Sequence, residues 1–230
     1  MSGNSSLGLS YSVSAASTPI RPLQPVDVTR VLAEVAPGQR QLVLRPLQPE
    51  DREDLARAID RLSETTRYHR FHSSGFRASR QDVDYLSSVD GNDHVAWCLI
   101  DRTTYEGAGL GRWIRDGNAS HVAEAAVTVC DDFQGQGLSK VLLGTLMASS
   151  RCLGIDTLVG LVLNGNSRAL RLMDQLGASM RPGDPGTAAA HLSTDPARLP
   201  DTETARTVKD WIERIGGYTD PAPAPAVNQA

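Results

Sequence analysis

The chain has 230 residues, of which 40% are hydrophobic and 22% are charged, a composition typical of a globular protein with one sizeable core. The net charge of -4 at pH 7 argues against a nucleic-acid binder, because such proteins usually carry an excess of basic residues. No run of about 18 apolar residues is present, so we expect neither a membrane-spanning helix nor a membrane partner.

The two ends of the chain differ in composition from its middle. Residues 1–40 are rich in Ser, Gly, Pro and Ala, and we expect them to be largely disordered. The first basic residue is Arg21, so the basic start of a secretory signal is missing and we expect a cytoplasmic protein. The Pro/Ala-rich stretch 217–230 predicts an extended, disordered tail. The folded part then comprises a domain over 41–200 and a C-terminal helix over 201–216.

Cysteine and histidine usage gives no sign of a metal site. Cys98, Cys130 and Cys152 each lie in an apolar segment, and none of them is spaced as a metal pair. We expect buried thiols in a reducing compartment. The five histidines have no acid or thiol at metal-ligand spacing, so we expect no metal.

Hydrophobic periodicity predicts the elements in chain order. Alternation predicts a strand at 41–47, and helical spacing predicts three helices at 49–62, 63–72 and 79–89, with Ser63 as an N-cap. Three strands follow at 94–101, 107–116 and 121–129. A long helix at 135–154, a buried strand at 157–163, a helix at 166–177 and two short strands at 178–182 and 187–193 complete the domain.

This order places a three-strand meander before a βαβ crossover. A doubly wound fold would alternate strands and helices throughout. We therefore expect an α/β fold built on a mixed sheet, with helices on both faces.

The stretch VAEAAVTVCDDFQGQGLSKVLL, residues 122–143, runs from a strand through two glycines into a helix. The first N–H groups of a helix have no internal partner and lie at the positive end of its dipole. Glycines let a phosphate approach such groups without a Cβ clash. We expect Asp131 and Asp132 to cap the turn, and the following amides, from Gln134 to Ser139, to bind phosphate. Neither a Walker loop nor a dinucleotide fingerprint fits, since the latter needs glycine at Lys140.

At these residues the chain resembles the GNAT acyl-CoA N-acyltransferases. Their signature, Gln/Arg-x-x-Gly-x-Gly/Ala, reads here as Gln134-Gly135-Gln136-Gly137-Leu138-Ser139, with Ser139 in place of the final Gly or Ala. A second similarity is the pattern N-x-x-A-x-x-L-x-x-x-L-G, which starts at Asn166. The tyrosine that many members use as a general acid is replaced here by Met173. The element order agrees over roughly 41–193.

The resemblance implies a GNAT fold and acetyl-CoA as cosubstrate. The strand 122–129 should splay from the strand 157–163, and the pantetheine arm should pair with the backbone of Val127, Thr128 and Val129 in the gap. The pyrophosphate should sit on the amides of 134–139, and Asn166 should complete the cofactor-binding set.

Acyl transfer to an amine needs a neutral amine, and at pH 7 deprotonating a lysine of pKa about 10.4 costs about 4.6 kcal/mol. Glu124 is the candidate general base, because it precedes the glycine turn among small neighbours, where partial burial would raise its pKa. Its surroundings and the segment LSETTRYHRFH resemble bacterial protein-lysine acetyltransferases, whose glutamate is the proposed base. A solvated glutamate on the open face of the sheet is the alternative.

We predict an acetyl-CoA-dependent N-acetyltransferase whose acceptor is a primary amine, with a protein lysine implied by the second resemblance. Two alternatives stay open: acetylation of a small-molecule amine, and a non-catalytic acyl-CoA-binding regulatory module. Both a monomer and a homodimer fit the sequence. The basic and aromatic residues of 67–80 are interpreted as core and groove wall, so no nucleic-acid partner is expected.

Overall fold

The computed structural model describes Val26–Asp27 and residues 41–219. The expected disordered segment 1–40, apart from those two residues, lies outside the described part, and so does the tail after Thr219. None of the described helices is both long and apolar enough to cross a membrane.

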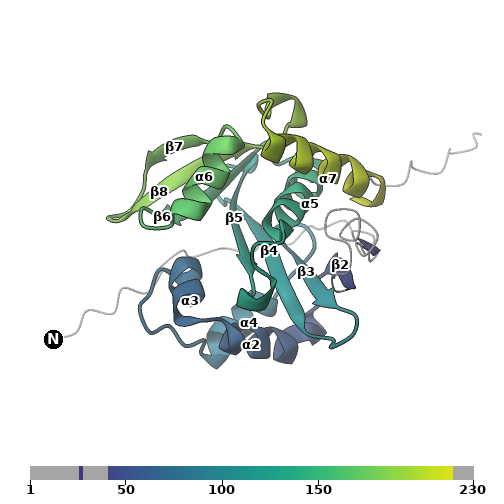
Figure 1. Ribbon diagram of the computed structural model, residues 1–230, viewed down its shortest axis with the longest axis vertical. Helices are drawn as coiled ribbons and strands as arrows, with labels where there is room; N and C mark the ends of the chain where they lie inside the picture. The colour runs from purple at the N-terminus through teal and green to yellow at the C-terminus, as the bar shows by residue number, and fades with distance from the viewer. Residues whose placement is uncertain (1–25, 28–40, 220–230) are drawn as a thin grey trace, which may run out of the picture.

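An eight-stranded sheet forms the centre of the molecule (Figure 1), in the order β1-β2-β3-β4-β5-β6-β8-β7. The strands are Val26–Asp27 (β1), Leu42–Pro46 (β2), His94–Asp101 (β3), Gly107–Arg115 (β4), Val122–Val129 (β5), Thr157–Leu163 (β6), Ser179–Pro182 (β7) and Thr187–Ser193 (β8). The β5–β6 pair is parallel and the other pairs are antiparallel. The predicted mixed sheet is therefore confirmed, although β8 lies between β6 and β7.

Within the described residues, six α-helices and three short 3-10 turns surround the sheet. They are Pro49–Asp51 (η1), Arg52–Arg61 (α2), Glu64–Phe71 (α3), Arg80–Ser87 (α4), Asp131–Phe133 (η2), Leu138–Cys152 (α5), Ser167–Gln175 (α6), Pro196–Arg198 (η3) and Glu203–Thr219 (α7). The last helix continues through the two glycines at which the expected helix ended, so the predicted boundary at 216 is three residues short.

Helix α5 packs closely on the strands that carry the candidate motif. A side chain at Gly109 or Gly111 of β4 would place its Cβ 3.3 Å from Leu142 or Leu146 of α5. Because these two positions are glycine, the long apolar helix can sit directly on the sheet. Helix α7 then covers α5, and the helices α2, α3 and α4 cover the opposite face (Figure 1).

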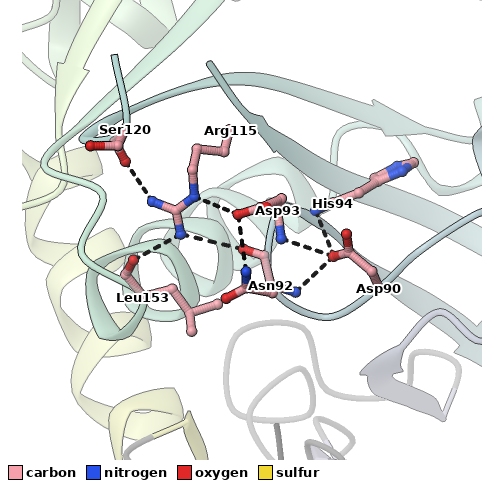
Figure 2. A network of polar contacts seen from close by, with 7 residues as sticks. All are labelled: Asp90, Asn92, Asp93, His94, Arg115, Ser120 and Leu153. Atoms are coloured by element: carbon pink, nitrogen blue, oxygen red, sulfur yellow. Dashed lines mark hydrogen bonds and ion pairs between the residues drawn. The ribbon is translucent and has the colours of Figure 1, made fainter. Parts of the chain in front are cut away.

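A polar network fixes the end of the sheet where β4 finishes (Figure 2). The Arg115 guanidinium donates to the Asp93 carboxylate at 2.6 Å, to the Leu153 carbonyl at 2.9 Å and to the Ser120 carbonyl. The Asp90 carboxylate accepts from three backbone amides in the turn that leads into β3, including His94 at 2.9 Å. One arginine thus joins β3, β4, the entry to β5 and the end of α5.

Candidate acyl-transfer site

The parallel pair β5–β6 separates after three residues. Val122, Ala123 and Glu124 align with Thr157, Leu158 and Val159, and beyond that point the only described partner of β6 is β8. In Figure 1, β6, β7, β8 and α6 diverge from the rest of the sheet at this point. The expected splay is confirmed, and no strand of the described residues pairs with this edge of β5 over 125–129.

The register decides which β5 residues face this gap. The Cys130 amide donates to Ala108 and the Asp116 amide donates to Val122, both at 2.9 Å. Backbone groups in an antiparallel ladder alternate in direction. Val127 and Val129 therefore direct their N–H and C=O groups into the gap, as the resemblance implies. The backbone groups of Thr128 point to β4. Its side chain lines a cavity on the face of the sheet that is opposite to α5.

The glycine turn presents a row of backbone donors at the start of α5. Gly135 and Gly137 have φ of 78° and 79°, the left-handed region that favours glycine. Within the described part of the chain, no acceptor faces the five amides of residues 135–139, whereas the Gln134 amide donates to the Asp131 carbonyl at 3.2 Å. These donors converge at the N-terminus of a 15-residue helix, an arrangement suited to a phosphate. The glycines also delay the helix to Leu138, three residues after the expected start.

Asn166 lies directly after β6 and is the N-cap of α6. Its side-chain oxygen accepts from the Ala169 amide at 3.1 Å. That bond fixes the start of α6 and leaves the side-chain amide nitrogen for other partners.

Glu124 lies on the face of β5 that is opposite to α5, two residues from Ala126 and four from Thr128. The side chain is exposed, so the partial burial expected from the sequence is not found. Its negative charge nevertheless influences four nearby residues, because it contributes to the shifted pKa values of Arg70, His72, Tyr85 and Arg112.

Sequence reasoning missed one of these neighbours, Arg112, together with its partner His94. Arg112 of β4 is only 3% exposed, and it donates to the Leu86 carbonyl at 2.7 Å and lies 2.9 Å from His94 Nε2. Burial, with the nearby charge of Arg70, lowers the pKa of Arg112 to about 9. Burial and the charge of Arg112 lower the pKa of His94 to about 4, so a neutral His94 accepts this bond at pH 7. The available signal was an arginine inside the apolar stretch GLGRWI.

Asp131 connects the glycine turn to the helix α3. Its carboxylate accepts from the Ser63 amide at 2.9 Å, the Ser63 hydroxyl at 2.7 Å and the Thr66 hydroxyl at 2.8 Å. Burial opposes but does not cancel these bonds, and the pKa of Asp131 is lowered. The expected role of Asp131 as a cap of its own turn is thus wrong in part, because its carboxylate bonds to Ser63 and Thr66 at the start of α3. Ser63 is the N-cap of α3, as predicted.

Cysteine chemistry is disfavoured near the gap. Burial raises the pKa of Cys130 to about 11 and that of Cys98 to about 12, so both are protonated thiols at neutral pH. Cys152 is half-buried, which differs from the expected burial. No group of three metal-binding side chains occurs among the residues that the structure describes.

Comparisons with known proteins agree with this geometry. The family model described as Acetyltransferase (GNAT) domain matches residues 41–179. Acetyltransferase Pat of Mycolicibacterium smegmatis is 31% identical over 169 residues, which are 74% of this chain and 50% of that protein. Acetyltransferase PA5475 of Pseudomonas aeruginosa is 33% identical over 134 residues, 57% of this chain and 71% of that protein. The chain therefore spans half the length of the Pat protein.

Among solved structures, the GNAT domain of S. lividans PAT is similar with a TM-score of 0.65 and 24% identity. The similarity covers 74% of this chain and 96% of that chain. At this identity it shows a shared fold.

Proposed function

Since the chain belongs to the GNAT family of acetyltransferases, we propose that it moves the acetyl group of acetyl-CoA directly to a primary amine, namely the side chain of a protein lysine. The splayed gap beside β5 carries this proposal, because it offers free backbone groups next to a phosphate-binding turn. The name of the Pat relative supports an acetyltransferase, and the LSETTRYHRFH segment supports a protein acceptor.

The proposed cofactor contacts follow from the backbone. The amides of Gly135, Gln136, Gly137, Leu138 and Ser139 would hold the pyrophosphate, with Gln134 and Asn166 beside them. Val127 and Val129 would pair with the pantetheine arm. The Val129 carbonyl already accepts from the Gln134 side chain at 3.2 Å, so its N–H is the available group.

In the proposed reaction Glu124 accepts a proton from the amine, directly or through water, as the amine nitrogen attacks the thioester carbonyl. A backbone N–H near Val129 polarises that carbonyl, and the C–S bond breaks to release the CoA thiolate. Met173 stands where many relatives place a tyrosine, so the thiolate leaves without a phenol donor at that position. An exposed carboxylate suits a base that must meet a large acceptor.

The decisive measurement is thiol release from acetyl-CoA by the wild type and by Glu124→Gln, with lysine-bearing proteins and small amines as acceptors. We expect a loss of about a hundredfold in kcat for Glu124→Gln, because general base catalysis is typically worth that much. Acetyl-CoA binding, followed by thermal shift, should not change. Glu203→Gln, an exposed substitution on α7, is the matched control.

Each other outcome has a defined meaning. Equal turnover by the wild type and Glu124→Gln would remove Glu124 from the mechanism. Binding of acetyl-CoA without turnover on any acceptor would favour a regulatory acyl-CoA-binding module. Turnover with small amines only would replace the protein acceptor with a small molecule.

A further inference from the structure

A cavity with about 90 Å³ of free space lies between the sheet and the helices α2, α3 and α4. Its walls are mainly apolar and include Leu55, Ile59, Leu62, Phe71 and Leu110. Five charged residues also line it, and none of the five belongs to the glycine turn. Which of these five charges have an oppositely charged partner indicates the kind of ligand that the cavity can bind.

Three of these five charges are compensated by nearby groups. Arg45 forms a bidentate salt bridge with the Asp51 carboxylate, and both nitrogen–oxygen distances are 2.6 Å. Asp54 is paired with Arg57 on the same helix. The other two, Arg70 and Arg112, are absent from the ion pairs within 4.0 Å that the described residues form.

Arg112 is the more unusual of the two. It is almost fully buried, and its Nε has no hydrogen-bond partner among the described residues. Its two bonded partners, His94 and the Leu86 carbonyl, carry no negative charge.

Arg70 adds a second positive charge to the same wall. Buried charges are normally paired, because an uncompensated one costs several kcal/mol. The Glu124 carboxylate influences both guanidinium groups but does not line the cavity, and the two lining carboxylates, Asp51 and Asp54, already pair with other arginines. The lining itself therefore offers Arg70 and Arg112 no carboxylate partner.

The cavity also lies beside the proposed reaction centre. Arg112 pairs across the ladder with Ala126, which is two residues, or about 7 Å, along β5 from Glu124. Thr128, next to the two residues that face the gap, lines the cavity as well. A molecule that reacts in the gap can therefore extend an apolar stem over β5 and place a charged end near Arg70.

We propose that this cavity is a subsite for a carboxylate carried on a short apolar stem, which Arg70 binds directly and Arg112 attracts from behind. The apolar walls suit the stem, the two guanidinium groups suit the carboxylate, and the volume admits only a few carbon atoms beyond it. The carboxylate can belong to the acyl chain of the donor or to the acceptor. Binding itself is independent of the proposed function, whereas its part in acyl transfer rests on that function.

The first test is binding without turnover. Isothermal titration of the wild type with butyrate should give a Kd at least about tenfold lower than with butyramide, its neutral counterpart. Arg70→Gln should abolish this preference and Arg70→Lys should keep most of it. Arg80→Gln, an exposed substitution on α4, is the matched control and should bind like the wild type. Circular dichroism would establish that each variant is folded.

Two kinetic arms then identify the source of the carboxylate. One compares succinyl-CoA with butyryl-CoA for the same amine, and the other compares aminocarboxylates with their amides for acetyl-CoA. A preference that Arg70→Gln lowers about tenfold in one arm assigns the source. Butyrate binding without a preference in either arm would identify a free acid as the ligand. Equal affinity for butyrate and butyramide, or unchanged binding in Arg70→Gln, would overturn the proposal even if acetyl transfer is confirmed.

Discussion

His94 makes the stability of this protein depend on pH. Its pKa is lowered to about 4 by burial and by Arg112, with Asp90 acting in the opposite direction and Tyr85 packed against the ring. In the unfolded chain the pKa of histidine is about 6.5. Between these values the unfolded state binds more protons, so this contribution is complete above pH 6.5 and is lost as the pH falls toward 4. At about 1.36 kcal/mol per unit, the loss amounts to roughly 3 kcal/mol.

Urea unfolding from pH 7 to pH 4.5 measures this effect, since the range stays above the usual aspartate pKa of about 3.9. The wild type should lose stability steadily over this range. His94→Gln, whose side-chain oxygen can still accept from Arg112, should show a much flatter dependence. His121→Gln, at an exposed position, is the control and should follow the wild type. Parallel curves for the wild type and His94→Gln would contradict a neutral, buried His94.

Single residues were predictable where the chemistry lies in one short segment. The glycine turn and the position of Glu124 follow from residues 122–139, and the structure places them around one gap. The cluster of Arg70 and Arg112 was not predictable, because the two side chains come from elements 42 residues apart and meet through packing. The exposure of Glu124 also depends on how far α3 stands from the sheet, which local sequence does not determine.

At the scale of elements, the contact between α5 and α7 is unusually close. A Cβ at Gly144 of α5 would lie 2.7 Å from the Trp211 Cβ of α7. Gly144→Ala should therefore push the helices apart and lower the free energy of unfolding by about 1–3 kcal/mol, despite the higher helix propensity of alanine. Gly117→Ala, which adds a methyl group in open space, is the control and should change stability by less than about 0.5 kcal/mol.

Urea unfolding of Gly144→Ala and Gly117→Ala tests whether the contact between α5 and α7 requires a glycine. A stabilised Gly144→Ala protein would show that α7 tolerates a shift and does not depend on this contact. The role of Gly144 could not be predicted from the sequence, because a glycine within a helix is ordinarily destabilising. The reason for this glycine is the second helix, whose Trp211 lies 67 residues further along the chain.

The helices and strands themselves were largely predictable, and their arrangement was predictable only in part. Periodicity located the strands 94–101, 157–163 and 187–193 without error and the other four predicted strands within one residue at each end. The placement of β8 between β6 and β7 depends on pairing between distant segments, which periodicity does not report. Helix α5 starts later than predicted, because two glycines in the left-handed backbone conformation precede it.

At the scale of the whole molecule, hydrogen bonds join the glycine turn to the helix α3. The Asp131 carboxylate bonds to Ser63, the N-cap of α3, from 68 residues away, and the Gln134 side chain donates to Thr66 at 3.2 Å and to the Val129 carbonyl. Helix α3 in turn carries Arg70. A ligand on the turn and a molecule beside Arg70 therefore act on the same connection, and any coupling between them must be reciprocal.

Asp131→Ala should break this connection in two measurable ways. The variant loses the hydrogen bonds that the carboxylate accepts from Ser63 and Thr66, which should cost about 1–3 kcal/mol and would be detected by urea unfolding. Helix α3 would also be held less firmly, so we expect KM for the amine to rise by about tenfold, with a smaller change in kcat because Glu124 lies on β5. Asp132→Ala is the matched control, since the neighbouring carboxylate is exposed and has no hydrogen-bond partner among the described residues. If both variants behave alike, the turn and α3 are independent, and this contact carries no coupling between the ligands that bind at them.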